Sequence, residues 1–446
     1  MALVLDSPTT SCGDDDAHAL DVRRALLRLP RPCAGTGTVP ARLLQGAAVA
    51  AAAVAAGALV STRYAWASTG DYTGDVLVVL SLRGGFDGLS AVVPAADPAY
   101  AAARPTVGIP DQSLLALDRT FGLHPALAPL KPLWDAGRFG AGHAVGQPVP
   151  SRSHFTAMEE LERAAPGSGA RTGWLDRTLG MRGRGSAFQA VQVGGTMVPR
   201  ALSGPSPELA MGSLDRFEVA DAWDDPEAAR WQAALTGMHA GAPAQLRVPA
   251  EAKIAAAQTA ASVRATAYVP AGGAVYPKDE LGNALRDVAR LVKAGVGLQV
   301  ACIDVDDWDM HAGMGRVESG WMRDKLAALA AGLVAFATDL GSRLDGVTLV
   351  TLSEFGRRVA ENGSGGVDHG HGNAVLLLGG GVVGGRVHGS WPGLAPGRLV
   401  DGDLAATTDY RLVLGEILQK RCGAGSLTTI FPGLAGTPLG VARERA

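Results

Sequence analysis

Four mostly apolar runs, each followed closely by polar or glycine-rich residues, constrain the fold of this 446-residue chain more than any other feature. They occupy residues 75–82, 298–305, 347–352 and 373–381. Runs of this length without polar alternation are typical of strands that are buried on both faces, as in a parallel sheet. Residues 138–146 and 188–199 resemble two further strands.

Helical patterns lie between or after these runs, at residues 251–269, 279–296, 320–344 and 409–421. Alternation of apolar strands with helices is the signature of βαβ units, whose strands lie parallel in one sheet. The sequence therefore predicts an α/β fold with a doubly wound, mostly parallel sheet flanked by helices. Residues 200–250 are rich in Pro, Asp and Trp and show no clear period, so we expect an irregular insertion or cap there.

The N-terminal 67 residues resemble a twin-arginine export signal. Two arginines stand in VRRALLR at residues 22–28, an uncharged apolar segment covers residues 43–60, and the small residues of AWA end at Ala67. This order predicts cleavage after Ala67 and export of a single domain, residues 68–446, to the periplasm, cell envelope or extracellular space. The alternative is a retained N-terminal membrane anchor, because the apolar segment approaches the length of a membrane span.

Charge and cysteine content add two smaller constraints. The formal net charge of −3 gives no electrostatic footprint for nucleic acid. Two of the four cysteines, Cys302 and Cys422, lie after the predicted cleavage site. We expect Cys302 to be a buried thiol within its apolar run, with a Cys302–Cys422 disulfide as the alternative in an oxidising compartment.

Acidic and imidazole side chains gather directly after the predicted strands. Open α/β sheets bind ligands outside the carboxyl ends of their strands, so these side chains are expected to converge at one edge. Carboxylates and imidazoles together suit zinc or another divalent metal, whose identity and number the sequence leaves open. The candidate metal ligands are Asp87, Asp309, His311, Glu354, Asp368, His369 and His371.

Each group of candidates has a plainer interpretation. Asp87 follows two glycines that permit close approach to a ligand, but aspartate is also common as a turn cap. Asp309 and His311 lie in an acidic segment that could simply be a solvated loop. The loop of residues 353–373 carries the remaining ligands between glycines, which allow the chain to bend around a cation, although a polar surface loop would have a similar composition.

Ser153, His154 and Arg357 are the candidate catalytic residues. Ser153 precedes a helical pattern, where backbone N–H groups favour an anion and a nucleophile could attack an ester; an ordinary N-cap is the alternative. His154 could act as a base, bind a metal or support a ligand. Arg357 could pair with a carboxylate of the site or with an anionic substrate.

Seven segments then occur in a characteristic order, namely LRGGFDGLSAVVP, PSRSHFTAMEELE, GWLDR, WDMH, TLSEFGRRV, DHGHGN and GGRVHGSWPGL. Together they resemble the exported bacterial domain-of-unknown-function family 1501, within the broader alkaline phosphatase and sulfatase superfamily. The resemblance covers roughly residues 75–420. It implies an alkaline-phosphatase-like doubly wound sheet, one or two metals held by Asp and His, and a nucleophile that acts on phosphoesters or sulfoesters.

The resemblance also suggests roles by position. Asp87 resembles the metal aspartate after the first strand, Ser153 lies near the nucleophile position, and Asp309 with His311 resembles the central aspartate–histidine pair. The DHGHGN segment, with Asp368, His369 and His371, resembles the segment near the C-terminus that supplies histidine ligands to the metal site in this superfamily. Two departures stand out: Phe355 follows Glu354 where many members have a histidine, and Pro148 stands where a sulfatase carries its modified cysteine.

Two functional hypotheses follow from these observations. The first is an exported metal-dependent hydrolase of phosphoesters or sulfoesters, with a small-molecule or polymer substrate. The second is a non-catalytic scaffold or binding protein of the cell envelope, with a protein partner, that keeps the fold with a degenerate metal site.

Overall fold

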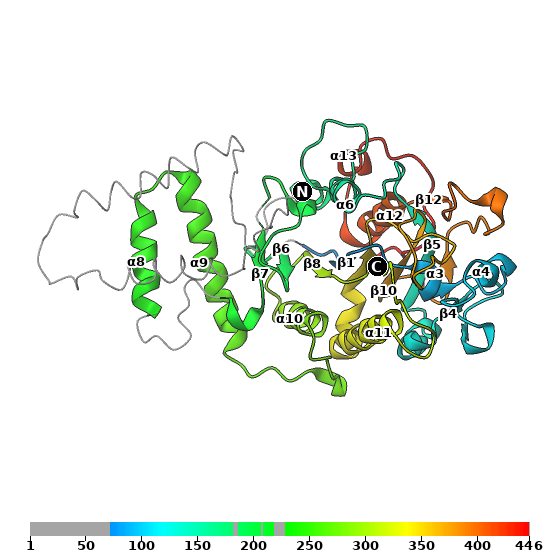
Figure 1. Ribbon diagram of the computed structural model, residues 1–446. Coiled ribbons are helices and arrows are strands. Elements are labelled where there is room, and N and C mark those ends of the chain that lie inside the picture. The colour runs from blue at the N-terminus through cyan, green and yellow to red at the C-terminus, as the bar shows by residue number, and fades with distance from the viewer. Residues whose placement is uncertain (1–71, 182–185, 207, 218–227, 446) are drawn as a thin grey trace, which may run out of the picture. The chain divides into compact units, whose positions relative to one another are not determined.

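The computed structural model describes residues 72–181, 186–206, 208–217 and 228–445. The predicted export signal, residues 1–67, lies outside these residues, and so does the alternative membrane anchor. Within the described part of the chain, nine strands form one sheet and three short strands form a second (Figure 1).

The strands of the large sheet come from widely separated parts of the sequence. In spatial order they are β11 (Val387–His388), β5 (Phe139–Gly146), β10 (Asn373–Gly379), β9 (Val347–Leu352), β1 (Val76–Leu82), β8 (Val300–Val305), β6 (Ala190–Val193) and β7 (Leu209–Met211), while β12 (Thr408–Asp409) pairs with β5 off this path. The small sheet contains β2 (Val92–Val93), β4 (Gly122–Leu123) and β3 (Leu115–Ala116). All six predicted strands are therefore present.

One strand makes the large sheet mixed. β10 runs antiparallel to both of its neighbours, β9 and β5, whereas every other pairing is parallel. The prediction of an α/β fold with a mostly parallel sheet is confirmed at this level. The reversal has a functional consequence, because the amino end of β10 lies at the same edge as the carboxyl ends of the other strands.

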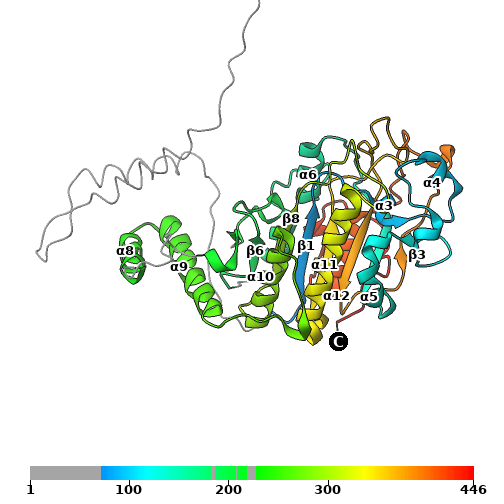
Figure 2. The same ribbon diagram turned by 60° about the horizontal axis from the view of Figure 1, so that its bottom comes forward.

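Helices cover both faces of the sheet, as the alternation of β1 requires. Val78 and Leu80 belong to a buried cluster with α10 (Glu280–Ala294) and α11 (Trp321–Leu340). Leu77 and Val79 point to the other face, where the buried cluster includes residues of α6 (His154–Arg163), α7 (Trp174–Gly180) and α12 (Tyr410–Cys422). Both figures show α10 and α11 side by side on one face (Figures 1 and 2).

The clearest predicted helices begin and end where capping chemistry places them. The Asp279 carboxylate accepts a hydrogen bond from the Gly282 amide at 2.7 Å, and Gly295 ends α10 in the left-handed conformation. The predicted helix at residues 279–296 is thus confirmed with slightly shorter bounds. α11 with its following turn is apolar and long enough to cross a membrane, but it packs into the buried cluster as a core helix.

The segment 200–250 contains more regular structure than its composition suggests. β7 extends the edge of the large sheet beside β6. α8 (Ala228–Ala240) and α9 (Ala244–Arg264) follow, so the predicted helix at residues 251–269 begins earlier than expected. The remaining short helices are α3 (Gly88–Ala91), α4 (Pro98–Ala103), α5 (Lys131–Asp135) and α13 (Leu427–Ile430).

The two described cysteines do not form a disulfide. Cys302 on β8 and Cys422 at the end of α12 are both buried and are not bonded to each other, so the alternative of a bridge between them is wrong. Burial raises the pKa of the Cys302 thiol well above its usual range, and the nearby Asp304 carboxylate adds to this effect. The interpretation of Cys302 as a buried, unreactive thiol is consistent with this environment.

Candidate metal centre

Five chain segments meet at the edge where most strands of the large sheet end. Four follow β1, β8, β9 and β5, and the fifth precedes the reversed strand β10. Convergence at this edge was expected from the parallel strands. The reversal of β10 explains why the DHGHGN loop joins the site although it precedes its strand.

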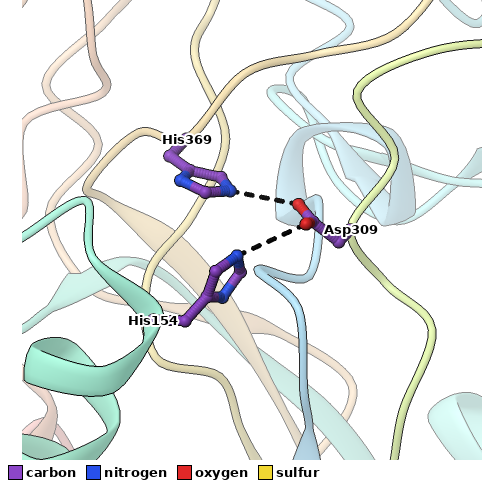
Figure 3. Close-up of side chains that lie close together, drawn as sticks. All are labelled: His154, Asp309 and His369. Carbon is purple, nitrogen blue, oxygen red and sulfur yellow. Dashed lines mark hydrogen bonds and ion pairs between the residues drawn. The ribbon is translucent and has the colours of Figure 1, made fainter. Parts of the chain in front are cut away.

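Three side chains at this edge form a group that could hold a metal ion. His154, Asp309 and His369 each offer one ligand atom, and these atoms lie within 4.8 Å of one another. Figure 3 shows both imidazoles pointing toward the Asp309 carboxylate. Nε2 of His369 lies 3.0 Å from Asp309 Oδ1, and Nε2 of His154 lies 3.4 Å from Asp309 Oδ2.

The surroundings of His154 fix which of its ring nitrogens carries a proton. Nδ1 lies 2.8 Å from Oε1 of Glu354, an acceptor, so Nδ1 carries the hydrogen. In the neutral ring Nε2 then has a free lone pair. This nitrogen is buried and has no hydrogen-bond partner among the described residues. His154 therefore presents an unused lone pair to the Asp309 carboxylate.

His369 and His311 follow the same rule. Nδ1 of His369 lies 2.9 Å from the carbonyl oxygen of Arg152, and Nδ1 of His311 lies 2.8 Å from Asp368 Oδ1. Both acceptors require a hydrogen on Nδ1, which leaves both Nε2 atoms bare in the neutral rings. These two Nε2 atoms are only 2.8 Å apart, and His311 Nε2 also lies 3.0 Å from Asp309 Oδ1. Lone pairs at this spacing repel unless a proton or a cation lies between them.

This arrangement fits a metal site by two criteria. Ligands about 2.0–2.1 Å from a tetrahedral zinc ion lie about 3.3 Å from one another. The three contacts between an Nε2 atom and Asp309 and the contact between His311 and His369 here are 2.8–3.4 Å long, and the ligand atoms of His154, Asp309 and His369 all lie within 4.8 Å of one another. Metal-binding histidines also donate their other ring N–H to a carboxylate or a backbone carbonyl. His154, His311 and His369 all have such an acceptor.

Burial and neighbouring charges favour the protonation states in which Asp309 and His369 can bind a metal. Burial would raise the pKa of Asp309, but the hydrogen bond and the positive charge of Arg357 hold this pKa at about 2, so the carboxylate is ionised. Burial lowers the pKa of His369, and the positive charge of Arg357 lowers it further. An ionised carboxylate and a neutral imidazole are the forms that bind metal.

Two predicted metal residues support ligands instead of joining the group. Glu354 is buried, and its Oε1 also accepts a hydrogen bond from the Gly84 amide at 2.8 Å. Its Oε2 accepts a hydrogen bond from the Ser353 hydroxyl at 3.1 Å. Asp368 orients His311 and accepts a second hydrogen bond, from Asn362 Nδ2, at 2.9 Å.

Arg357, a candidate catalytic residue, is buried, and its guanidinium forms hydrogen bonds with other residues of the protein. Its Nη2 lies 2.7 Å from Asp309 Oδ1, and its other nitrogens donate to the backbone oxygens of Gly85 and Val367. It therefore pairs with a carboxylate of the site, which was one of its two expected roles.

The structure places Asp87, His371 and Ser153 outside the group. Asp87 is buried and forms two hydrogen bonds with Arg104, at 2.5 and 3.0 Å. His371 Nε2 lies 2.8 Å from the carbonyl oxygen of Gln147. Ser153 is exposed and is the N-cap residue of α6, but its side chain forms no capping hydrogen bond. Its Oγ accepts a long hydrogen bond from the Thr156 hydroxyl, at 3.5 Å.

Sequence reasoning missed several residues that shape the site. Arg152 contributes a backbone carbonyl, which no side-chain pattern could indicate. Asn362 lies in the glycine-rich loop and could have been noticed there as a partner for Asp368. Arg104 binds Asp87 from α4's C-terminal cap, and nothing in the local sequence connects the two.

An open cleft of about 580 Å³ adjoins the group. Its lining includes His154, Asp309 and Glu354, and it also includes the exposed side chain of Phe155. Its charged lining contains two guanidinium groups and six carboxylates, those of Arg83, Arg200, Glu159, Glu162, Glu354, Asp306, Asp307 and Asp309. Without a cation the cleft is therefore acidic.

Fold and site together define an α/β protein with a candidate metal centre at the edge of a mixed sheet. The chain belongs to the DUF1501 family, described as a protein of unknown function, whose model matches residues 137–416. The matched region contains His154, Asp309, His311 and His369, so the whole candidate centre lies within the family domain. A comparison with curated proteins finds no match.

Proposed function

We propose that this protein is a metal-dependent hydrolase of phosphoesters or sulfoesters. One observation carries the proposal. His154, His311 and His369 have their Nδ1 atoms hydrogen-bonded to acceptors, and all three Nε2 atoms are directed toward the Asp309 carboxylate. Such a set of imidazole lone pairs beside an ionised carboxylate is suited to a divalent cation, zinc being one that fits these donors.

The protein's own residues would hold and tune the cation. His154, His369 and Asp309 would bind it, with His311 as a further ligand. When bound, the cation would supply Lewis acidity to an ester oxygen and would lower the pKa of a water molecule. Glu354 fixes the ring of His154, and the buried guanidinium of Arg357 keeps Asp309 ionised.

Water is a better candidate nucleophile than Ser153. The described contacts of the Ser153 hydroxyl are limited to Thr156, and the side chain does not take part in the group. The open cleft, in contrast, reaches His154 and Asp309 directly and has the size of a small-molecule site. Phe155 in its lining favours an ester with an apolar alcohol portion.

We extend the proposal to the superfamily of this protein and to its location in the cell. The mixed sheet flanked by helices, with ligands at the strand ends, is consistent with membership of the alkaline phosphatase and sulfatase superfamily. The twin-arginine pattern in residues 22–28 supports export of the mature domain, residues 68–446.

A non-catalytic role is the second candidate, and two observations favour it. No described contact joins Ser153 to the group, and the acidic lining of the cleft disfavours anionic esters unless a cation is bound. On this alternative the protein would be an envelope scaffold or binding protein that keeps the fold with a degenerate metal site and does not hydrolyse esters.

Metal content of residues 68–446, purified without chelator and measured by elemental analysis, tests the proposal first. We expect near-stoichiometric divalent metal, lost in His154→Ala and His369→Ala but kept in the control His239→Ala on α8. Hydrolysis of aryl phosphates and sulfates by the metal-loaded protein then separates the two candidates. Metal binding without turnover favours the scaffold, and a folded protein without metal contradicts the hydrolase.

A further inference from the structure

A small buried cavity lies behind the candidate metal centre. It measures about 20 Å³ and is lined by apolar residues together with Gln147, Ser353, Glu354, His371, Asn373 and Tyr410. Two atoms of its lining residues, Gln147 Oε1 and His371 Nδ1, are buried and have no hydrogen-bond partner among the described residues. Gln147 is only 5% exposed, so bulk water does not compensate its amide oxygen.

The hydrogen bonds around the cavity define both atoms as acceptors. Gln147 Nε2 donates to the carbonyl oxygens of Ala157 and Glu354, at 2.8 and 2.7 Å, which fixes the orientation of the amide. His371 Nε2 lies 2.8 Å from the carbonyl oxygen of Gln147 and must carry the ring hydrogen. Nδ1 of His371 is then a bare lone pair in the neutral ring. A ligand that contacts both of these atoms must therefore donate two hydrogen bonds.

Size and chemistry together select the ligand. One water molecule needs about 10–15 Å³ of such space and two to four polar partners, so a cavity of about 20 Å³ holds one. We propose that a single buried water molecule occupies this cavity, donates to Gln147 Oε1 and His371 Nδ1, and locks Gln147 as a positioning residue of the metal centre. The positioning role rests on the proposed function, whereas the water site does not.

Gln147 connects the three segments that supply or support the metal ligands. Its Nε2 donates to the carbonyl oxygen of Glu354 and so holds the loop after β9. The carboxylate of Glu354 in turn fixes the ring of His154. Through Ala157, Gln147 holds the first turn of α6, which begins at His154. Through its own carbonyl oxygen it holds His371, which is two residues from His369. Movement of Gln147 would therefore disturb the ligands on both sides of Asp309.

A pair of matched glutamine variants tests the positioning role. Gln147→Met keeps the shape of the side chain but removes its hydrogen bonds. Gln299→Met is the control, because Gln299 has the same 5% exposure and an unpartnered buried Oε1, yet precedes β8 at the opposite edge of the sheet. We expect Gln147→Met to raise the zinc dissociation constant about 10–100-fold, and Gln299→Met to leave it within about threefold of the wild type. Equal constants for the two variants would overturn the role.

Two further measurements test the inference without relying on metal binding, so they can be judged separately from the proposed function. A high-resolution crystal structure of the wild type should show one water within hydrogen-bond distance of Gln147 Oε1 and His371 Nδ1; an empty cavity would overturn the water site. Imidazole nitrogen chemical shifts of metal-free protein should show one Nδ1–H tautomer of His154, and a mixture of tautomers in Gln147→Met. If the wild type binds no divalent metal, the proposed function fails, while these two readouts still decide the inference.

Discussion

At the scale of single residues, we expect zinc affinity to depend on the hydrogen-bond acceptors that hold the imidazole rings as well as on the ligands themselves. Glu354→Gln keeps the shape of the side chain but loses the charge that holds Nδ1–H of His154. We expect zinc affinity to fall about 10–100-fold, measured by competition with a chromophoric chelator. Glu159→Gln is the control, because Glu159 lines the same cleft but pairs with Arg200. Equal affinities for the two variants would refute a supporting role for Glu354.

For Asp87, also at the scale of single residues, we expect the opposite of the result for Glu354, namely lost stability with unchanged zinc affinity. Asp87→Asn leaves the guanidinium of Arg104 buried without its charge partner, and breaking such a pair costs about 3–5 kcal/mol of unfolding free energy. Zinc affinity should not change. Asp345→Asn, which removes an exposed pair with Arg138, should cost less than about 1 kcal/mol in the same urea titration. Loss of metal from folded Asp87→Asn would instead return Asp87 to the ligand set.

At the scale of elements, the turn after β1 fits against the turn after β8. Gly84 has φ +112°, and an added Cβ would lie 2.7 Å from the backbone nitrogen of Asp309. Gly84→Ala should therefore displace Asp309, weaken zinc binding and cost roughly 1–3 kcal/mol of unfolding free energy. Gly313→Ala is the control, because Gly313 has φ +58° but open space around its Cα. It should lose stability from backbone strain alone and keep its zinc affinity.

The same scale shows what the sequence could predict and what it could not. Apolar runs predicted the strands, and polar residues after them predicted the edge where the site forms. The direction of β10 could not be predicted, since a run buried on both faces reads alike in either orientation. The Arg104–Asp87 pair was equally hidden, because the position after a strand and two glycines suits a ligand and a buried ion pair alike.

At the scale of the whole molecule, two buried histidines outside the metal centre couple folding to pH. Burial lowers the pKa of His124 and of His143 to about 4, in each case from 6.5, so both stay neutral in the fold. The unfolded chain takes up these protons first as pH falls. Their contribution to stability is therefore complete above pH 6.5 and is lost as pH falls toward 4. A shift of this size corresponds to roughly 3 kcal/mol for each histidine.

Metal-free protein is the appropriate sample for this prediction, because the imidazoles of the metal centre then bind no cation at any pH. We expect the unfolding free energy from urea titrations to fall between pH 6.5 and 4, by about 1.4 kcal/mol per pH unit for each proton taken up. His143→Gln removes one titrating ring, so its slope should be smaller by about one proton, whatever the substitution costs at neutral pH. An unchanged slope in His143→Gln would mean that His143 is not kept neutral by burial against Phe121 and Trp391.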